Sequence, residues 1–154
     1  MALVQSKQIV SRMPVPSLDE ANEPTYIFGE YVVPAGGLAI NDVIEMGGVS
    51  PNMRVIDAIV HNTACGASAT FDLGILSRSY GVTTGTARTC GNEFIAAGDM
   101  NATTVKRLTK SVTTDLVGAT ENPADDTLGW GIKVTGAVYP AAAVIRATLV
   151  VMSK

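Results

Sequence analysis

The sequence predicts an all-β protein that folds as one domain, and two observations carry this prediction. Residues 69–76 alternate apolar and polar side chains, which is the two-residue period of a half-buried strand. Residues 43–46 and 53–60 are rich in β-branched side chains, and they are separated by Gly47, Gly48 and the Ser-Pro-Asn of residues 50–52, a composition that lets a chain reverse. At 154 residues the chain can build one packed core and is too short for two ordinary domains.

Residues 1–24 are predicted to form an extended arm, and residues 25–154 the single domain. Prolines at positions 14, 16 and 24 remove backbone donors and disfavour helix. The arm is too apolar for a solvated tail, so we expect it to order against a neighbouring subunit. Deletion of residues 2–20 is then expected to weaken assembly and to leave the fold intact. The arm residues expected to make subunit contacts are Leu3, Val4, Ile9, Val10, Met13 and Val15.

The domain begins with a predicted strand over residues 26–33, in which both faces are apolar. The residues at 34–37 turn the chain into the hairpin of residues 43–60, and the strand at 69–76 follows. Residues 77–92 are rich in Gly, Ser and Thr and are predicted to be a long surface loop that could face a partner. In the first strand, Tyr26, Phe28 and Val32 share one face, and Ile27, Tyr31 and Val33 share the other.

Residues 92–112 fit no single pattern. Phe94 and Ile95 could begin a strand, whereas Val105, Leu108 and Val112 follow helical spacing behind a possible cap at Asn101, so we expect a short helix or an irregular excursion. Lys106, Arg107 and Lys110 form a basic cluster that we interpret as a solvated face.

The C-terminal end predicts two strands, over residues 130–138 and 143–151. Trp130, Ile132 and Val134 alternate with small or polar residues and define a core face. The final strand is nearly continuous in apolar residues, and we expect it inside the sheet, because an unpaired apolar edge strand is an aggregation hazard.

Charge and hydropathy exclude some partners. The net charge of −3 does not supply the clustered Lys and Arg side chains that neutralise phosphates, so nucleic acid is not an expected partner. There is no apolar run of about 18 residues, so no membrane span is expected. Charged residues are only 16% of the chain, which suggests that part of its surface is covered in an assembly.

The candidate reactive groups do not form a catalytic or metal-binding set. His61 is the sole histidine, and it could pair with Cys65 as base and nucleophile, but no orienting third residue is evident. Cys65 and Cys90 lack C-x-x-C spacing and are expected to be free thiols. We therefore predict no catalytic residue, no metal site and no cofactor.

Two segments resemble the small β-rich virion proteins of tailed bacteriophages. The first, over residues 30–76, contains VPAGGLAINDVIEMGGVSPNMRVIDAIV followed by ATFDLGIL. The second, over residues 128–152, is LGWGIKVTGAVYPAAAVIRATLVV, which is similar to the closing hairpin of those proteins, where an Ala-rich turn leads into an Ile-Arg-x-Thr-Leu strand.

The resemblance implies a capsid decoration or cement protein with a jelly-roll-like β-sandwich. Such a protein sits on the outer surface of the virion head, is assembled in the host cytoplasm, binds the major capsid protein and has no enzymatic activity. Self-assembly into a trimer is the first expectation and a dimer the second, since closed symmetric assemblies are the norm. In this reading the arm clamps a neighbouring subunit, the loop at 77–92 is a contact surface, and Tyr80 is its exposed aromatic.

Two other classes of protein remain to be weighed. A receptor- or carbohydrate-binding sandwich of a phage fibre or tail needs an exposed aromatic platform, and Tyr80 is the aromatic residue expected in a loop. A cupin-like enzyme needs several histidine ligands, and this chain has one.

Overall fold

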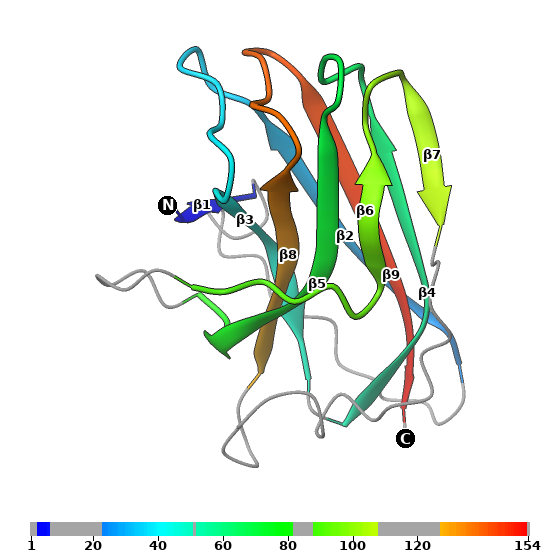
Figure 1. The fold of residues 1–154 in the computed structure, drawn as a ribbon. Coiled ribbons are helices and arrows are strands. Elements are labelled where there is room, and N and C mark those ends of the chain that lie inside the picture. The colour runs from blue at the N-terminus through cyan, green and yellow to red at the C-terminus, as the bar shows by residue number, and fades with distance from the viewer. Residues whose placement is uncertain (1–2, 7–22, 51, 82–87, 108–126, 154) are drawn as a thin grey trace.

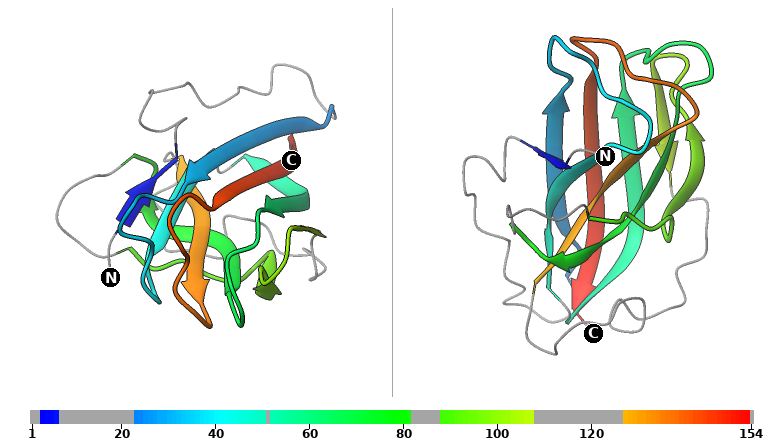
Figure 2. Two further views of the ribbon diagram at one scale, coloured as in Figure 1. Left: turned by 90° about the horizontal axis from the view of Figure 1, so that it is seen from above. Right: turned by 60° about the vertical axis from the view of Figure 1, so that its left-hand side comes forward.

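The computed structural model describes residues 3–6, 23–50, 52–81, 88–107 and 127–153, and these residues form a β-sandwich (Figure 1). Within them no helix is present, so the predicted all-β class is confirmed. The view from above in Figure 2 shows the two sheets as two layers. The strands are β1 (Leu3–Gln5), β2 (Thr25–Val32), β3 (Val43–Val49), β4 (Met53–Asn62), β5 (Thr70–Ser79), β6 (Ile95–Asp99), β7 (Thr104–Arg107), β8 (Leu128–Thr135) and β9 (Val144–Ser153).

The strand order is interleaved between the two layers. Sheet A has the order β1-β3-β8-β5-β6, and sheet B has the order β2-β9-β4-β7. From β2 to β9 the chain changes sheet at every step except between β5 and β6. Every pairing is antiparallel apart from that of β1 with β3, which is parallel. Two four-stranded sheets with this alternation, extended by β1, are consistent with a jelly roll.

The core lies between the sheets, where the alternating residues of both layers meet. Trp130 and Ile132 of β8 pack there with Phe71 and Leu73 of β5, and all four side chains are fully buried. Strand β9 lies between β2 and β4, so its predicted position inside a sheet is confirmed. Its inward residues are Ile145, Ala147, Leu149 and Val151.

The segment with ambiguous spacing forms two strands. Residues 95–99 pair with β5 as β6, and residues 104–107 pair with β4 as β7. The expected helix is absent from this described part, and Val105 projects from a strand instead. Helical spacing was misleading because cross-strand pairing with β5 and β4 decides the local structure. Leu108 and Val112 lie outside the described residues.

The first residues of the predicted arm pair with this chain's own sheet, and the contact with a neighbouring subunit that we expect of the arm stays a prediction. Residues 3–5 form β1 beside β3, and Val4 packs against the core. The N–H of Ser6 donates to the carbonyl of Glu45 (2.7 Å), and its hydroxyl donates to the carbonyl of Met46 (2.7 Å). Nothing further is described for the side chain of Leu3, and Ile9, Val10, Met13 and Val15 lie outside the described residues.

Candidate functional site

The outer face of sheet A is covered by a segment of the same chain. Residues 88–94, which we call the covering segment, cross in front of β8 and β5 (Figure 1). The sheet beneath them carries glycines, which leave room for this close approach. A Cβ atom on Gly129 would lie 2.5 Å from Nη2 of Arg88, and one on Gly74 would lie 2.5 Å from the carbonyl oxygen of Gly91. No side chain larger than hydrogen fits at these two positions without displacing the covering segment.

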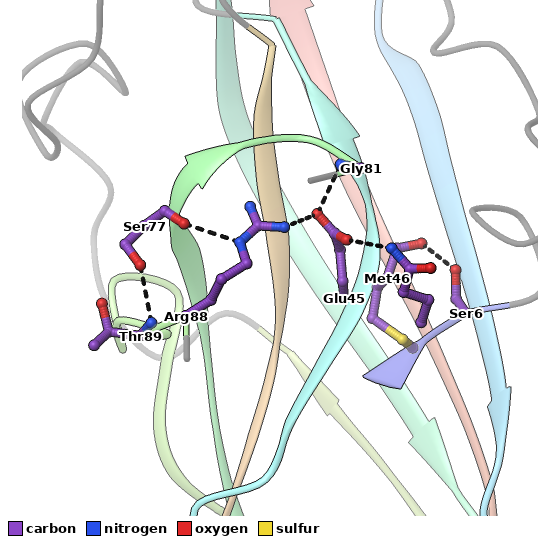
Figure 3. A network of polar contacts seen from close by, with 8 residues as sticks. Ser6, Glu45, Met46, Ser77, Gly81, Arg88 and Thr89 are labelled. Carbon is purple, nitrogen blue, oxygen red and sulfur yellow. Dashed lines mark hydrogen bonds and ion pairs between the residues drawn. The ribbon is translucent and has the colours of Figure 1, made fainter. Parts of the chain in front are cut away.

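A buried ion pair holds the covering segment to the sheet (Figure 3). Nη1 of Arg88 contacts Oε1 of Glu45, and both side chains are almost completely buried. Nε of Arg88 donates to the carbonyl of Ser77 (2.9 Å), and the N–H of Gly81 donates to Oε1 of Glu45 (3.2 Å). Because each charge has a partner and further hydrogen bonds, the pair can be buried without an unpaired charge.

The same carboxylate also holds the N-terminal strand. Nε2 of Gln5 donates to Oε2 of Glu45 (3.2 Å), so β1 and the covering segment meet on one side chain. Sequence reasoning predicted both regions as contacts with other molecules. Their described residues make contacts within the chain, and Glu45 is the residue that joins them. The only sequence feature that indicated this role of Glu45 was its position as an acidic residue within an otherwise apolar predicted strand.

The two cysteines are free thiols, as expected. Sγ of Cys90 donates to the carbonyl of Gly131 (3.2 Å), and burial, followed by the nearby charge of Glu93, raises the pKa of this thiol to about 12. Cys65 lies in the core, and burial raises the pKa of its thiol to about 11. His61 is exposed on the outer side of β4, so the structure does not bring it together with Cys65 as a base and nucleophile.

The described residues contain neither a metal-binding cluster nor a membrane-spanning helix. They contain no group of three or more His, Cys, Asp and Glu side chains that could hold a metal ion. They also contain no helix of the length and hydropathy needed to cross a membrane.

The outer face of sheet B is apolar and exposed. Seven large hydrophobic side chains are exposed within the described residues, and five of them stand on strands of this sheet. Tyr26 is 65% exposed and Phe28 44%, and both project outward from β2. On β4 a bulge places Ile56 and Asp57 in succession on the outer side. The five are Tyr26, Phe28, Val32, Ile56 and Val105.

The acidic groups on this face are paired within the chain. Nε of Arg146 donates to Oε2 of Glu30 (2.7 Å), which links β9 to β2. Nη2 of Arg107 contacts Oδ2 of Asp57, which links β7 to β4. The interpretation of the basic cluster as a solvated face holds for Arg107, whose side chain is exposed. Lys110 lies outside the described residues.

Tyr80 is not a free loop aromatic. Its ring lies over Gly48, where an added Cβ would be 2.8 Å from Cγ of the ring, and its N–H donates to the carbonyl of Thr127 (2.8 Å). Burial, together with the charge of Glu45, raises the pKa of its hydroxyl. The exposed aromatic residues are Tyr26 and Phe28, which the sequence analysis placed on one apolar face of a predicted strand without predicting that they are exposed. The sequence feature that could have predicted their exposure was the strand with two apolar faces. In a two-layered sandwich one face of each strand lies on the outside, so one of these apolar faces is exposed to solvent.

Comparisons with known proteins place this fold among phage capsids. A chain in the capsid of Ralstonia phage GP4 matches with a TM-score of 0.83 and 28% identity, over 99% of both chains. A chain in the capsid asymmetric unit of cyanophage Pam1 has the same fold, with a TM-score of 0.61 and 13% identity over 93% of this chain and 94% of that one. No family model and no curated protein matches. The likeness to the GP4 chain supports a phage capsid-related protein with a structural role in the virion.

Proposed function

We propose that this chain is a capsid decoration, or cement, protein that binds the outer surface of a phage head and stabilises contacts between major capsid subunits. The observation that carries the proposal is the likeness to the GP4 capsid chain over nearly the full length of both chains. The chain consists of one sandwich in its described part and has only 16% charged residues, which suits a small protein with a surface covered by neighbours.

Cementing works through many weak contacts. On a repeating lattice each copy needs only modest affinity, because several contacts made at once raise the effective concentration of the others. Copies joined by closed symmetry, a trimer first and a dimer second, present several arms to the shell together. The major capsid protein is the proposed partner, and no enzymatic activity, cofactor, nucleic acid or membrane enters the proposal.

The arm can be tested apart from the fold. Because residues 3–6 bind β3, deletion of residues 2–20 removes part of sheet A as well as the proposed contact. Replacing Ile9, Val10, Met13 and Val15 by serine keeps β1 and removes the apolar side chains. The matched control replaces the polar arm residues Gln8 and Ser11 by alanine.

The decisive experiment mixes the purified chain with empty, expanded phage heads and images them. The unaltered chain and the control are expected to produce regularly spaced external density. The serine variant is expected to lose at least about 10-fold in affinity for the heads, the ratio that about 1.4 kcal/mol produces, measured as occupancy over a concentration series. Heads without added density would refute the cement function. Full decoration by the serine variant would instead exclude the arm as the contact.

The runner-up, a receptor- or carbohydrate-binding module of a fibre or tail, rested on Tyr80 as the aromatic platform. The ring of that residue packs on Gly48, which leaves less of it for a sugar. A glycan array with Tyr80→Ala as control tests the alternative directly, and specific glycan binding that this substitution abolishes would favour it over the cement function.

A further inference from the structure

The outer side chains of sheet B form continuous rows across its strands. Tyr26 of β2 lies beside Val150 of β9, and Phe28 lies beside Thr148, which in turn neighbours Ile59 of β4. The next row is charged and runs from Glu30 to Arg146 and His61. The apolar side chains of Tyr26, Phe28, Val150 and Ile59 therefore lie near one another over three strands, beside Asp57, which neighbours Val150 on β4 and is paired with Arg107. Such an apolar patch on a protein surface marks an interaction site.

Burying this face leaves its acidic groups paired. Glu30 is already bonded to Arg146, and Asp57 to Arg107. Arg54 is exposed on β4 beside Met152, in a row that β2 does not reach, so its charge can stay in solvent at the end of the face. A partner for the rows shared with β2 therefore needs to be apolar and close to neutral. A second copy of the chain has these properties, since it presents the same apolar rows and the same internally paired charges.

Shape and area also suit a second copy. Sheets pack face to face at about 10 Å with their strands about 30° apart, so a flat four-stranded face can pack against another such face. Three strands of 8 to 10 residues and one of 4 residues, about 4.8 Å apart, give a footprint of roughly 500 Å². The side chains that stand on it bring its accessible area toward the roughly 800 Å² that each partner buries in a standard interface.

We propose that the outer face of sheet B is the surface through which copies of this chain associate with one another. The outer face of sheet A cannot take this role at its centre, because the covering segment occupies it. The proposal does not depend on binding to a capsid, and its first test uses the isolated chain without heads.

The test measures mass in solution by analytical ultracentrifugation over roughly 1–100 μM, the range of a standard micromolar contact. The unaltered chain is expected at a multiple of its 16.0 kDa mass. Tyr26→Lys combined with Phe28→Lys places two charges on the apolar rows and is expected to weaken association at least about 100-fold. Val105→Lys, on the opposite edge strand of the sheet, is a second and independent variant. Circular dichroism checks that each variant is folded.

Matched controls use the two large hydrophobic residues that, within the described part of the chain, are exposed outside sheet B. Ile40 and Val138 are 47% and 63% exposed and lie in the connections that flank β3 and β8, so Ile40→Lys and Val138→Lys make the same chemical change away from the face. Both are expected to keep the mass of the unaltered chain. A monomeric unaltered chain throughout the range, or folded face variants that keep the full mass, would overturn the proposal. Face variants that keep their mass but fail to decorate heads would assign the face to the shell and overturn it equally.

Discussion

The two outer faces of the sandwich differ in what covers them. On sheet A, glycines leave room for the covering segment to lie close against the strands. A buried ion pair between Glu45 and Arg88 holds the segment there. On sheet B, large apolar side chains stand exposed, and the ion pairs among them are partly in solvent. The outer face of sheet A is covered by the chain itself. The outer face of sheet B exposes apolar side chains, as a surface does that another molecule covers. Charge interactions should therefore matter greatly to folding on sheet A and little on sheet B.

The largest expected effect follows from removing one charge on sheet A. Arg88→Met leaves the carboxylate of Glu45 buried without its cation, which should lower the free energy of unfolding by about 3–5 kcal/mol. Urea denaturation measures this change. The control replaces both Glu45 and Arg88 by methionine, which leaves no buried charge and should restore much of the loss. A single variant within about 1 kcal/mol of the unaltered chain would show that the pair does not hold the covering segment.

A smaller effect is expected from filling the space above the glycines. In Gly129→Ala the new Cβ would lie 2.5 Å from Nη2 of Arg88 and 2.6 Å from Oε1 of Glu45, and both atoms belong to the two side chains of the buried ion pair. Overpacking of this kind costs about 1–3 kcal/mol, which urea denaturation resolves. Gly36→Ala is the matched control, because nothing lies within 4 Å of its added Cβ, and a change within about 0.5 kcal/mol is expected. Equal effects of the two substitutions would contradict the covering arrangement.

Alkaline pH should destabilise the fold through its buried thiols. The pKa of Cys90 is raised to about 12 and that of Cys65 to about 11, from an ordinary value of 9.0. Since the unfolded chain ionises first, the stabilisation is complete below pH 9.0 and is lost as the pH rises from there through about 11 to 12. The expected loss near pH 10 is on the order of 1 kcal/mol per thiol.

Urea midpoints at a series of pH values measure this loss, and Cys90→Ala should flatten the curve. If the variant loses as much free energy of unfolding at alkaline pH as the unaltered chain does, the loss comes from groups other than Cys90. Tyr139 contributes in the same direction, because burial raises the pKa of its hydroxyl.

The smallest effect is expected from the ion pairs on sheet B. Arg107 is 67% exposed, so Arg107→Ala should cost less than about 1 kcal/mol, and the difference should shrink further at high salt. Equilibrium unfolding at low and high salt provides the measurement. A loss as large as that of Arg88→Met would remove the contrast between the two faces.

Sequence patterns predicted the parts of the fold that depend on local alternation. Period-two spacing located β5, β8 and β9, and continuous hydrophobicity indicated that β9 lies inside a sheet. The same reasoning allowed a strand at Phe94 and Ile95, where β6 begins, without choosing it, and it missed β7, where the helical spacing of Val105 competed with pairing to a distant strand. It also treated residues 77–92 as an outward loop, although Arg88 at its far end is buried on Glu45.

The sequence by itself determined the all-β class and the two apolar faces of the strand predicted to begin at Tyr26. Alternation and turn residues act over a few neighbours, so they can be seen without a fold. Only the tertiary structure decided which apolar face stays exposed, and that Gln5, Glu45 and Arg88 meet. These three residues come from separate parts of the chain, and their contact depends on the order of strands in sheet A, which no local pattern encodes.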